Sequence, residues 1–598
     1  MTDEHRDDRP WAPARGARLL LGLAAVAVAF AAADTYVVVL ALPDMMSSVG
    51  LAVDELQRAA PIVSGFLLGY VAMLPLIGRI ADLRGRVPVL VGSLVVFALG
   101  SLVTAAAYDL PSMVAGRFLQ GVGGGGLVPA TLALVADMYP PARRGVPLGV
   151  VGAVQELGSV VGPLYGALVL ALADWEEIFW VNLAVGLVLA AVLRGMPTDP
   201  VSPAGAGERA LTRRVDLVGA GLAVLAVACL TLVMLEPDAL ATDVTLGLGF
   251  LPVAGDSRWL SPLGLGFLLL TIALGFRCWF ARHPLVDVRR WGAVAANADL
   301  PGAALLALTL SGIILAFATA DPEVAVFAPA GPWLLLGSGV AAAGFWWHSR
   351  RTTHPLVPRG AFARTPAWGA LAVSFFIGAA LIAALVDIPI FARVTVYPES
   401  QLMAALVLVR LLVALPVGAL LGGYLTRTVP AGVVTAAGML LAAAGFVWMA
   451  QWGLTSLEQP VATVPLLATG LGFGLALAPV NAALLAATDD AVHGVTTALL
   501  VVARMVGMLV GISVLTTIGL RRYYAEQVGL PPPADVCDSG TRCAEYTTML
   551  KEAGLAQLQT VFVGAAVCAA VAALLALATF RSAQTRGISA AEALRQAG

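Results

Sequence analysis

Charged side chains are scarce in this sequence. Of its 598 residues, 12% are charged and 59% are hydrophobic, and the mean hydropathy is +0.89. An average soluble domain carries about twice that share of charge. A water-soluble protein this apolar would have to expose a large apolar surface, so the composition predicts a protein that lies in lipid. The net charge of −2 gives no sign of nucleic-acid binding.

Metal-binding and nucleotide-binding signatures are missing. The five cysteines and five histidines have no metal-ligand spacing. Cys229, Cys278 and Cys568 lie in or beside apolar runs, where cysteine behaves as a small core residue. No P-loop occurs, which argues against direct use of ATP. We therefore predict no metal and no cofactor.

Signatures of catalysis, receptor signalling and secretion are also missing. The sequence contains no H-E-x-x-H motif, and no Ser/His or paired-Asp site at matching depth in the apolar runs. The longest polar stretch, 521–556, is too short for a signalling domain. We therefore expect no enzyme, and a membrane enzyme or receptor is the remote alternative. The start of the chain is too polar for a signal peptide, so the first apolar run is predicted to be a retained helix.

Long apolar runs are abundant. A membrane-spanning helix needs about 20 mostly apolar residues. Sixteen segments meet this requirement: 18–42, 57–78, 88–108, 111–135, 146–172, 176–195, 215–236, 261–281, 298–319, 330–348, 367–391, 401–424, 431–451, 462–487, 494–520 and 557–580. The sequence therefore predicts an all-α membrane protein with about 16 transmembrane helices.

The basic residues select one orientation. With the first residue inside, the inside segments hold 25 arginines, whereas the outside segments hold six arginines and one lysine. The positive-inside rule then places both termini in the cytoplasm of a bacterial inner membrane. The polar loop 521–556 faces outward, which is an oxidising side in many bacteria. We expect a disulfide between its Cys537 and Cys543, with two free thiols as the alternative.

The two ends of the chain resemble one another. GVGGGGLVPATLA (121–133) is echoed by GLGFGLALAPVNAA (470–483), and ELGSVVGPLYG (156–166) by RMVGMLVGISV (504–514). Parallel repeats of this kind predict two six-helix lobes around a central site. We place the N-terminal lobe at 18–195 and the C-terminal lobe at 367–580.

Four further helices, within 215–348, are predicted between the lobes, flanked by cytoplasmic linkers at 196–214 and 349–366 and with cytoplasmic tails at 1–17 and 581–598. RHPLVDVRRWGA (282–293) is echoed by THPLVPRGAFAR (353–364). We interpret the insert as a duplicated helix hairpin that packs at the periphery.

Three short motifs carry a family resemblance. GRIADLRGR (78–86), RFLQG (117–121) and GSVVGPLYG (158–166) resemble the loop, fourth-helix and fifth-helix motifs of the major facilitator superfamily. DWEEIFWVN (174–182) is similar to the sixth-helix start of its fourteen-span drug:proton antiporters. The four inserted helices depart from the usual two. The resemblance implies two six-helix lobes that move by alternating access.

The same resemblance implies roles for individual residues. Asp82 is expected to meet the N-terminus of the helix at 494–520, where the helix dipole favours negative charge, and to gate the inner side. The small residues of the fifth-helix motif are expected to permit close helix contact or a bend. The gating set is Gly78, Arg79, Asp82, Arg84, Gly85, Arg86, Arg117, Gln120 and Gly121, and the packing set is Gly158, Gly162, Pro163 and Gly166. A packed helix-start residue is the alternative for Arg117.

A closer resemblance points to lipid. ADTYVVV (33–39), LVDIPIF (385–391) and HGVTTALLVVARMVGMLVG (493–511) are similar to the mycobacterial triacylglyceride transporter family, which works beside a periplasmic lipoprotein. This implies an exported lipid, a lipoprotein partner and a monomeric transporter. The general antiporter motifs fit multidrug efflux equally, so that alternative stays open.

Charges inside apolar segments each cost at least about 3 kcal/mol near the bilayer centre, and five of them are candidates for proton coupling. Glu156 and Arg504 are each about 15 Å into pseudo-equivalent helices, and we expect them to pair across the lobe interface, with a static structural pair as the alternative. Asp34 is our main candidate for proton binding, because a partly desolvated carboxylate takes up a proton more readily; an interfacial cap is its alternative. Asp387 is a second candidate. Arg410 either pairs with a cavity carboxylate or joins two helices.

Overall fold

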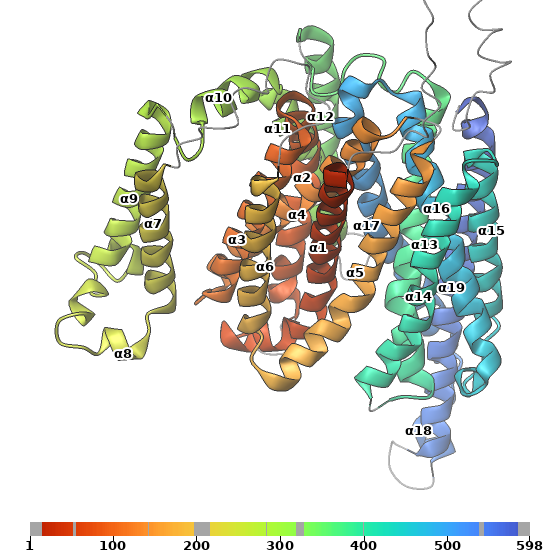
Figure 1. Ribbon diagram of the computed structural model, residues 1–598. Helices are drawn as coiled ribbons and strands as arrows, with labels where there is room; N and C mark the ends of the chain where they lie inside the picture. The colour runs from red at the N-terminus through yellow and green to blue at the C-terminus, as the bar shows by residue number, and fades with distance from the viewer. Residues whose placement is uncertain are drawn as a thin grey trace, which may run out of the picture.

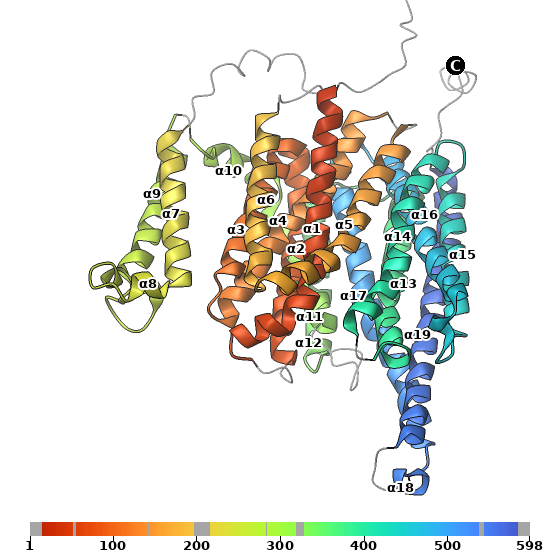
Figure 2. The same ribbon diagram turned by 60° about the horizontal axis from the view of Figure 1, so that its bottom comes forward.

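The computed structural model describes residues 15–51, 56–140, 143–196, 216–282, 284–318, 328–353, 355–398, 400–537 and 543–583. The N-terminal lobe consists of α1 (Arg15–Ser48), α2 (Leu56–Arg84), α3 (Arg86–Ala105), α4 (Leu110–Met138), α5 (Gly145–Leu172) and α6 (Glu176–Gly195). The C-terminal lobe consists of α13 (Thr365–Thr395), α14 (Gln401–Leu425), α15 (Ala431–Met449), α16 (Thr463–Ala487), α17 (His493–Val528) and α19 (Ala544–Thr579). The two lobes stand side by side in Figures 1 and 2.

Four long helices lie between the lobes in sequence: α7 (Leu217–Leu235), α9 (Pro262–Phe280), α11 (Leu300–Ala318) and α12 (Gly331–Arg351). The short helices are α8 (Asp238–Ala241), α10 (Val288–Asn297) and α18 (Pro533–Val536), with single 3-10 turns at Gly247–Gly249, Arg258–Leu260, Ser456–Glu458, Pro460–Ala462, Asp490–Val492 and Phe580–Ser582. We call the end of the bundle where α1 begins and α19 ends the terminal face, and the opposite end the loop face.

The predicted all-α architecture is confirmed. Thirteen helices in the described part of the chain are long and apolar enough to cross a membrane. The helices α1, α5 and α12 coincide with the remaining three predicted segments and contain 34, 28 and 21 residues. Helix α10 was not predicted, because it is short and lies in the arginine-rich segment between two apolar runs.

Within each lobe, small residues let the fifth helix approach the first helix closely. On α5, a Cβ atom added to Gly158 would lie 2.1 Å from the Ala29 carbonyl oxygen of α1, and one on Gly162 would lie 2.4 Å from that of Ala33. On α17, a Cβ atom on Gly507 would lie 2.0 Å from the Phe375 carbonyl oxygen of α13. Backbone contact of this kind needs glycine. Gly166 lies on the same helix as Gly158, and the Pro163 side chain lies outside the described part.

The insert is built from two hairpins, and each is held by the same kind of hydrogen-bonded cluster around one Asp side chain, which we call its clasp. In the first, Asp216 caps α7 by accepting from the Gly219 N–H, and it also accepts from Arg277 at the end of α9 and from the Leu285 N–H. These hydrogen bonds, led by those from Arg277, hold the pKa of Asp216 below its usual range. The Asp side chain therefore ties both ends of the hairpin to the segment that follows it.

The second hairpin repeats the clasp with one substitution. Asp299 caps α11 through the Gly302 N–H, accepts from the Leu356 N–H at 2.8 Å, and meets His348 of α12 at 2.6 Å. His348 thus takes the place of Arg277. Leu285 and Leu356 occupy matching positions in the two echoed segments, so one arrangement of contacts underlies the sequence repeat.

The two hairpins differ in how they meet the lobes. Helices α7 and α9 stand apart from the body in Figures 1 and 2, and α9 is mostly exposed. In contrast, α11 packs against both α2 and α17, where Ile314 is fully buried and the Ser513 hydroxyl of α17 donates to the Phe317 carbonyl. Helix α11 thus packs against the seam between the lobes, although no residue of α11 lines the central cavity, whereas α7 and α9 stand apart from both lobes.

A disulfide joins Cys537 and Cys543 at the loop face, beyond the ends of α17 and α19. Both helices contain 36 residues, which is more than a bilayer crossing requires. The bridge closes the connection between these two extended helices.

The clasp generates a first prediction. Asp299→Ala removes a helix cap and two further hydrogen bonds of a buried carboxylate, so the free energy of unfolding should fall by about 1–3 kcal/mol. Thermal unfolding of the purified protein in one detergent measures the change as a lower apparent Tm. The exposed Asp256, replaced by Ala, is the control. If the Asp299→Ala and Asp256→Ala variants have the same apparent Tm, the hydrogen bonds of Asp299 do not stabilise the hairpin.

Candidate functional site

A buried carboxylate organises the core of the N-terminal lobe. Asp34 lies on α1 with 2% of its surface exposed, and its Oδ2 accepts a hydrogen bond from Arg117 Nη1 of α4 at 3.0 Å. Asn182 of α6 donates to the other carboxylate oxygen, and so does Gln120 at 3.5 Å. Because burying a lone charge is costly, the guanidinium is what allows a carboxylate to remain here.

The network extends behind the carboxylate. Gln120 accepts from Arg117 at 2.7 Å and donates to the Ser101 hydroxyl of α3 at 2.8 Å. The Arg117 guanidinium carbon also lies 4.5 Å from the ring centroid of Phe66, in a cation–π contact. Helices α1, α2, α3, α4 and α6 therefore all contribute to one buried ion pair.

Arg117 connects this pair to a cavity between the lobes. The cavity has a volume of about 200 Å³ and apolar walls from α1, α2, α13 and α17. The lining residues with polar side-chain atoms are Arg117, Gln155, Arg504 and Tyr70. Asp34 is not among the residues that line the cavity, and its partner Arg117 is.

The structure places the side chains of Arg117 and Gln120 beside Asp34 rather than beside Asp82. The resemblance placed both in the gating set with Asp82, but their hydrogen bonds go to the Asp34 network. The alternative of a merely packed Arg117 does not hold either, since the guanidinium pairs with a carboxylate. The reason is the rotation of α4, which turns this pair of side chains toward α1.

Sequence reasoning missed Asn182 and Ser101. Asn182 ends the segment DWEEIFWVN, which was used only for the family resemblance. An amide in an otherwise apolar span is itself a signal of a polar partner nearby, because an unpaired amide in a membrane helix is costly.

Asp82 lies where the resemblance predicts. Its two carboxylate oxygens accept from the Gly494 N–H at 2.8 Å and the Val495 N–H at 3.1 Å, in the first turn of α17. Arg86 binds Asp82 and also reaches Asp137 of α4 at 3.0 Å. The N–H groups of a first helical turn lack partners within the helix, so an acidic side chain from the other lobe satisfies them.

The other members of the gating set surround this contact. Arg84 stacks on Trp291 of α10 with 5.0 Å to the ring centroid, and Arg79 lies one turn before Asp82 on α2. Gly85, with φ of 94°, caps α3 in a backbone conformation that other residues rarely adopt. Gly121 lies against α2, where an added Cβ would be 2.1 Å from the Phe66 carbonyl oxygen.

Two backbone contacts close the terminal face. A Cβ atom on either Gly78 or Gly494 would lie 2.5 Å from the carbonyl oxygen of the other. Between α5 and α14, a Cβ atom on Gly423 would lie 2.4 Å from the Gly145 carbonyl oxygen. Both contacts join the N-terminal lobe to the C-terminal lobe at the same end of the bundle.

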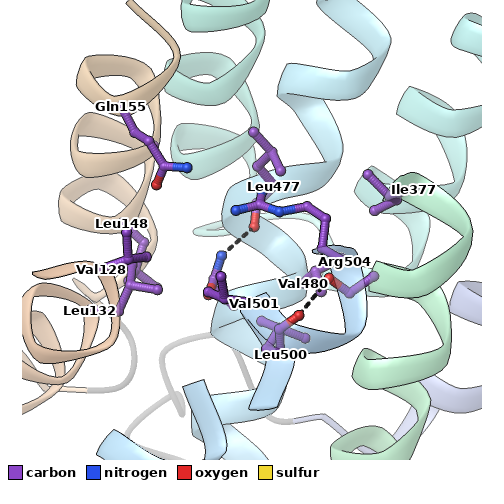
Figure 3. A pocket seen from close by; sticks show the side chains of 13 residues that line it. Val128, Leu132, Leu148, Gln155, Ile377, Leu477, Val480, Leu500, Val501 and Arg504 are labelled. Carbon is purple, nitrogen blue, oxygen red and sulfur yellow. Dashed lines mark hydrogen bonds between the residues drawn. The ribbon is translucent and has the colours of Figure 1, made fainter. Parts of the chain in front are cut away.

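Arg504 lies at the lobe interface. It lines the central cavity and also a smaller pocket on the terminal-face side, which it shares with Gln155 of α5 (Figure 3). The side chain of Glu156 lies outside the described part of the structure. The Glu156–Arg504 pair therefore stays a prediction, with Arg504 placed to make it.

The remaining two candidates differ in surroundings. Arg410 donates to the Thr463 hydroxyl of α16 at 3.2 Å, so within the described part it joins two helices rather than meeting a carboxylate. Asp387 on α13 has 3% of its surface exposed, and no hydrogen bond or ion pair links its side chain to another described residue. The contacts of Gly162 with Ala33 and of Gly511 with Ala379 match Asp34 with Ala380, so Asp387 lies about two turns further along its helix than the position of Asp34.

Comparison with known proteins decides the family. The model of the Major Facilitator Superfamily matches residues 24–512. The chain belongs to this superfamily. A triacylglyceride transporter of Mycolicibacterium hassiacum is 36% identical over 91% of this chain and 87% of its own length. One from Mycolicibacterium smegmatis is 33% identical over 94% and 88%, and a probable one from Mycobacterium leprae is 32% identical over 94% and 96%.

Solved structures agree on the major facilitator fold. The human organic anion transporter MFSD10 aligns with a TM-score of 0.53 at 14% identity, covering 94% of this chain and 99% of its own. The proton:xylose symporter XylE aligns with a TM-score of 0.51 at 13% identity, covering 97% and 98%. The protein is thus a multi-pass membrane transporter, and the family and relatives compared here are transporters rather than enzymes.

The gate yields a second prediction. Gly494→Ala places a Cβ atom against the Gly78 backbone, and overpacking of this kind costs about 1–3 kcal/mol, which lowers the closed-to-open ratio about tenfold. Spin labels on Gly195 and Thr428, which lie at the terminal-face ends of α6 and α14, report the lobe separation by pulsed electron paramagnetic resonance. We expect a longer mean distance.

The matched control is Gly92→Ala, since a Cβ atom there meets nothing within 4 Å. If the Gly494→Ala and Gly92→Ala proteins give the same distance distribution, the close contact of Gly78 and Gly494 does not hold the terminal face together.

Proposed function

We propose that this transporter is a proton-coupled exporter of a lipid such as triacylglyceride, working by alternating access. The observation that carries the proposal is the Asp34–Arg117 pair, which lies within the membrane-spanning bundle beside the cavity between the lobes. Three relatives that cover most of this chain are named triacylglyceride transporters, which supports a lipid substrate.

The apolar cavity supports the same substrate class. Its walls are formed by aliphatic, methionine and aromatic side chains, including Leu381, Met505 and Met508. A volume of about 200 Å³ is below the usual range for drug-sized ligands, about 300–1,000 Å³. A whole lipid therefore requires the lobes to move apart.

In the proposed orientation the terminal face is cytoplasmic and the protein lies in the bacterial inner membrane with both termini inside. The excess of arginine on that face supports this orientation. The contacts of Asp82 and of the paired glycines then close the cytoplasmic side. The disulfide-closed ends of α17 and α19 project outside, where a lipoprotein partner of a monomeric transporter would accept the lipid.

The proposed cycle uses exchange of partners by charged groups. A proton from outside neutralises Asp34, which weakens its pairing with Arg117. The proposed Glu156–Arg504 pair at the lobe interface responds in the same way. The lobes then rock so that the cytoplasmic side opens, lipid enters, and the proton leaves inside. One proton moving down 100 mV supplies about 2.3 kcal/mol, enough for a gradient of roughly fifty-fold.

Asp34 carries the third prediction. Asp34→Asn keeps the shape but cannot take part in proton exchange, so lipid transport driven by a pH gradient across proteoliposomes should fall at least about tenfold, the loss of one titratable site of this kind. Exchange of lipid without a gradient should persist. Asp256→Asn, in an exposed loop, is the control. Full gradient-driven transport by Asp34→Asn would exclude Asp34 as the coupling site.

Multidrug:proton antiport is the second candidate, because the fifth-helix motif resembles that of drug:proton antiporters. Its glycines Gly158 and Gly162 pack α5 against α1 beside Asp34. Proteoliposomes with radiolabelled triacylglyceride or with a cationic dye, each with and without a pH gradient, separate the two. Lipid movement without dye movement supports the lipid exporter. The reverse result supports drug efflux.

A further inference from the structure

A small pocket lies between the central cavity and the terminal face. Its volume is about 30 Å³, and residues from both lobes line it. Its polar groups come from Gln155, Ser374, Asn481 and Arg504, and the rest of the wall is aliphatic (Figure 3). Gln155 and Arg504 also line the central cavity, so they separate the two spaces.

Asn481 brings an unpaired acceptor to this pocket. Its Nδ2 donates to the Leu477 carbonyl one turn earlier on α16 at 2.9 Å, which fixes the orientation of the amide. The Oδ1 atom is buried and has no hydrogen-bond partner in the described part of the structure. A buried acceptor of this kind needs a donor, since leaving it unpaired is unfavourable.

Besides Asn481 itself, the side-chain donors in the pocket lining belong to Ser374, Gln155 and Arg504. The Ser374 hydroxyl already donates to the Leu500 carbonyl at 3.1 Å. Arg504 carries five N–H donors, and no hydrogen bond or ion pair joins its side chain to a described residue. Even a carboxylate bound side-on, such as the proposed Glu156, would engage only two of them. Arg504 is therefore the strongest donor that faces the pocket.

The pocket has room for water molecules between Asn481 and Arg504. A cavity needs about 10–15 Å³ of this kind of volume to hold one water molecule, so 30 Å³ accommodates about two. Water in a polar pocket bridges groups that lie beyond direct hydrogen-bond distance at little cost.

We propose that Asn481 is a positioning residue for the interface arginine: through ordered water its amide oxygen accepts from Arg504 and holds the guanidinium toward α5 of the other lobe. Asn481 and Arg504 both belong to the C-terminal lobe, so their link does not itself cross the interface. Its effect is to restrict a long, flexible side chain to the one direction in which it contacts the N-terminal lobe. Asn481 thereby favours the state closed at the terminal face, and this role rests on the alternating access proposed above.

The experiment uses the full chain in lipid nanodiscs, with spin labels on Gly195 and Thr428 and the free cysteines Cys229, Cys278 and Cys568 replaced by serine. Asn481→Leu keeps the branching and the number of heavy side-chain atoms but removes the acceptor. We expect the ratio of short to long distances to fall at least about tenfold, the effect of losing one hydrogen bond to a charged group.

A double-mutant cycle tests the dependence on Arg504. Arg504→Met alone should shift the same ratio toward the long distance, and adding Asn481→Leu should cause no further change, because residues that act through one another are not additive. Should Asn481→Leu fail to fold, Asn481→Ala, which also lacks the acceptor, takes its place in the cycle.

The matched control is Thr469→Val on the same helix. Thr469 Oγ1 is likewise buried without a partner in the described part, but it packs against Gly445 of α15, inside the C-terminal lobe. We expect this variant to match the unsubstituted protein. The proposal is overturned if Asn481→Leu leaves the distances unchanged, or if its shift persists in full beside Arg504→Met.

The distance measurement needs neither substrate nor gradient. A shift that appears as expected in a protein that moves no lipid would leave this inference standing and overturn the proposed function. If the protein transports lipid but Asn481→Leu leaves the distances unchanged, the proposed function stands and this inference is overturned.

Discussion

An ion pair buried in an apolar bundle is the constraint on which the N-terminal lobe depends. Asp34 and Arg117 are 2% and 1% exposed, and each offsets part of the cost of burying the other's charge. Removing one partner of such a pair typically costs about 3–5 kcal/mol. The surrounding amides hydrogen-bond to the pair and the Phe66 ring stacks on the guanidinium, whereas Arg117 Nε has no hydrogen-bond partner in the described part of the structure. The same dependence that stabilises the pair makes it responsive to a single proton.

The two lobes share a fold but not this chemistry. The repeat that aligns Gly121 with Gly470 places Leu466 and Thr469 at the positions of Arg117 and Gln120. The C-terminal lobe therefore keeps an acid, Asp387, without the cation. Its own cation, Arg504, faces the lobe interface instead. One lobe thus contains a complete buried ion pair, while the other presents a charge to its neighbour, which is an arrangement suited to coupling a proton to lobe movement.

The fold could be predicted from the sequence because lipid imposes simple rules. Hydropathy locates the helices, since each must bury about 20 apolar residues, and the internal repeat assigns them to lobes. The contact of Asp82 with α17 joins residues 412 apart, and it could be expected only from the family resemblance. The insert was divided correctly into two hairpins, because the Leu285 and Leu356 segments repeat visibly.

The partners of buried charges could not be predicted in the same way. Asp34 and Arg117 are 83 residues apart, and their meeting depends on the rotation of α1 and α4 about their axes. Hydropathy does not report that rotation in helices that are apolar on every side. For the same reason the position of α11 across the α2–α17 seam was missed: its sequence is as apolar as that of α7, and only packing distinguishes them.

The central claim is that Asp34 binds and releases a proton while it remains inside the bundle. Infrared difference spectroscopy of the protein in lipid, between low and high pH, measures this directly through the carbonyl band of protonated carboxylic acids. The account predicts a band that Asp34→Asn abolishes and that the exposed-site variant Asp256→Asn leaves intact. A difference spectrum in which no carboxylic-acid band depends on Asp34 would contradict it.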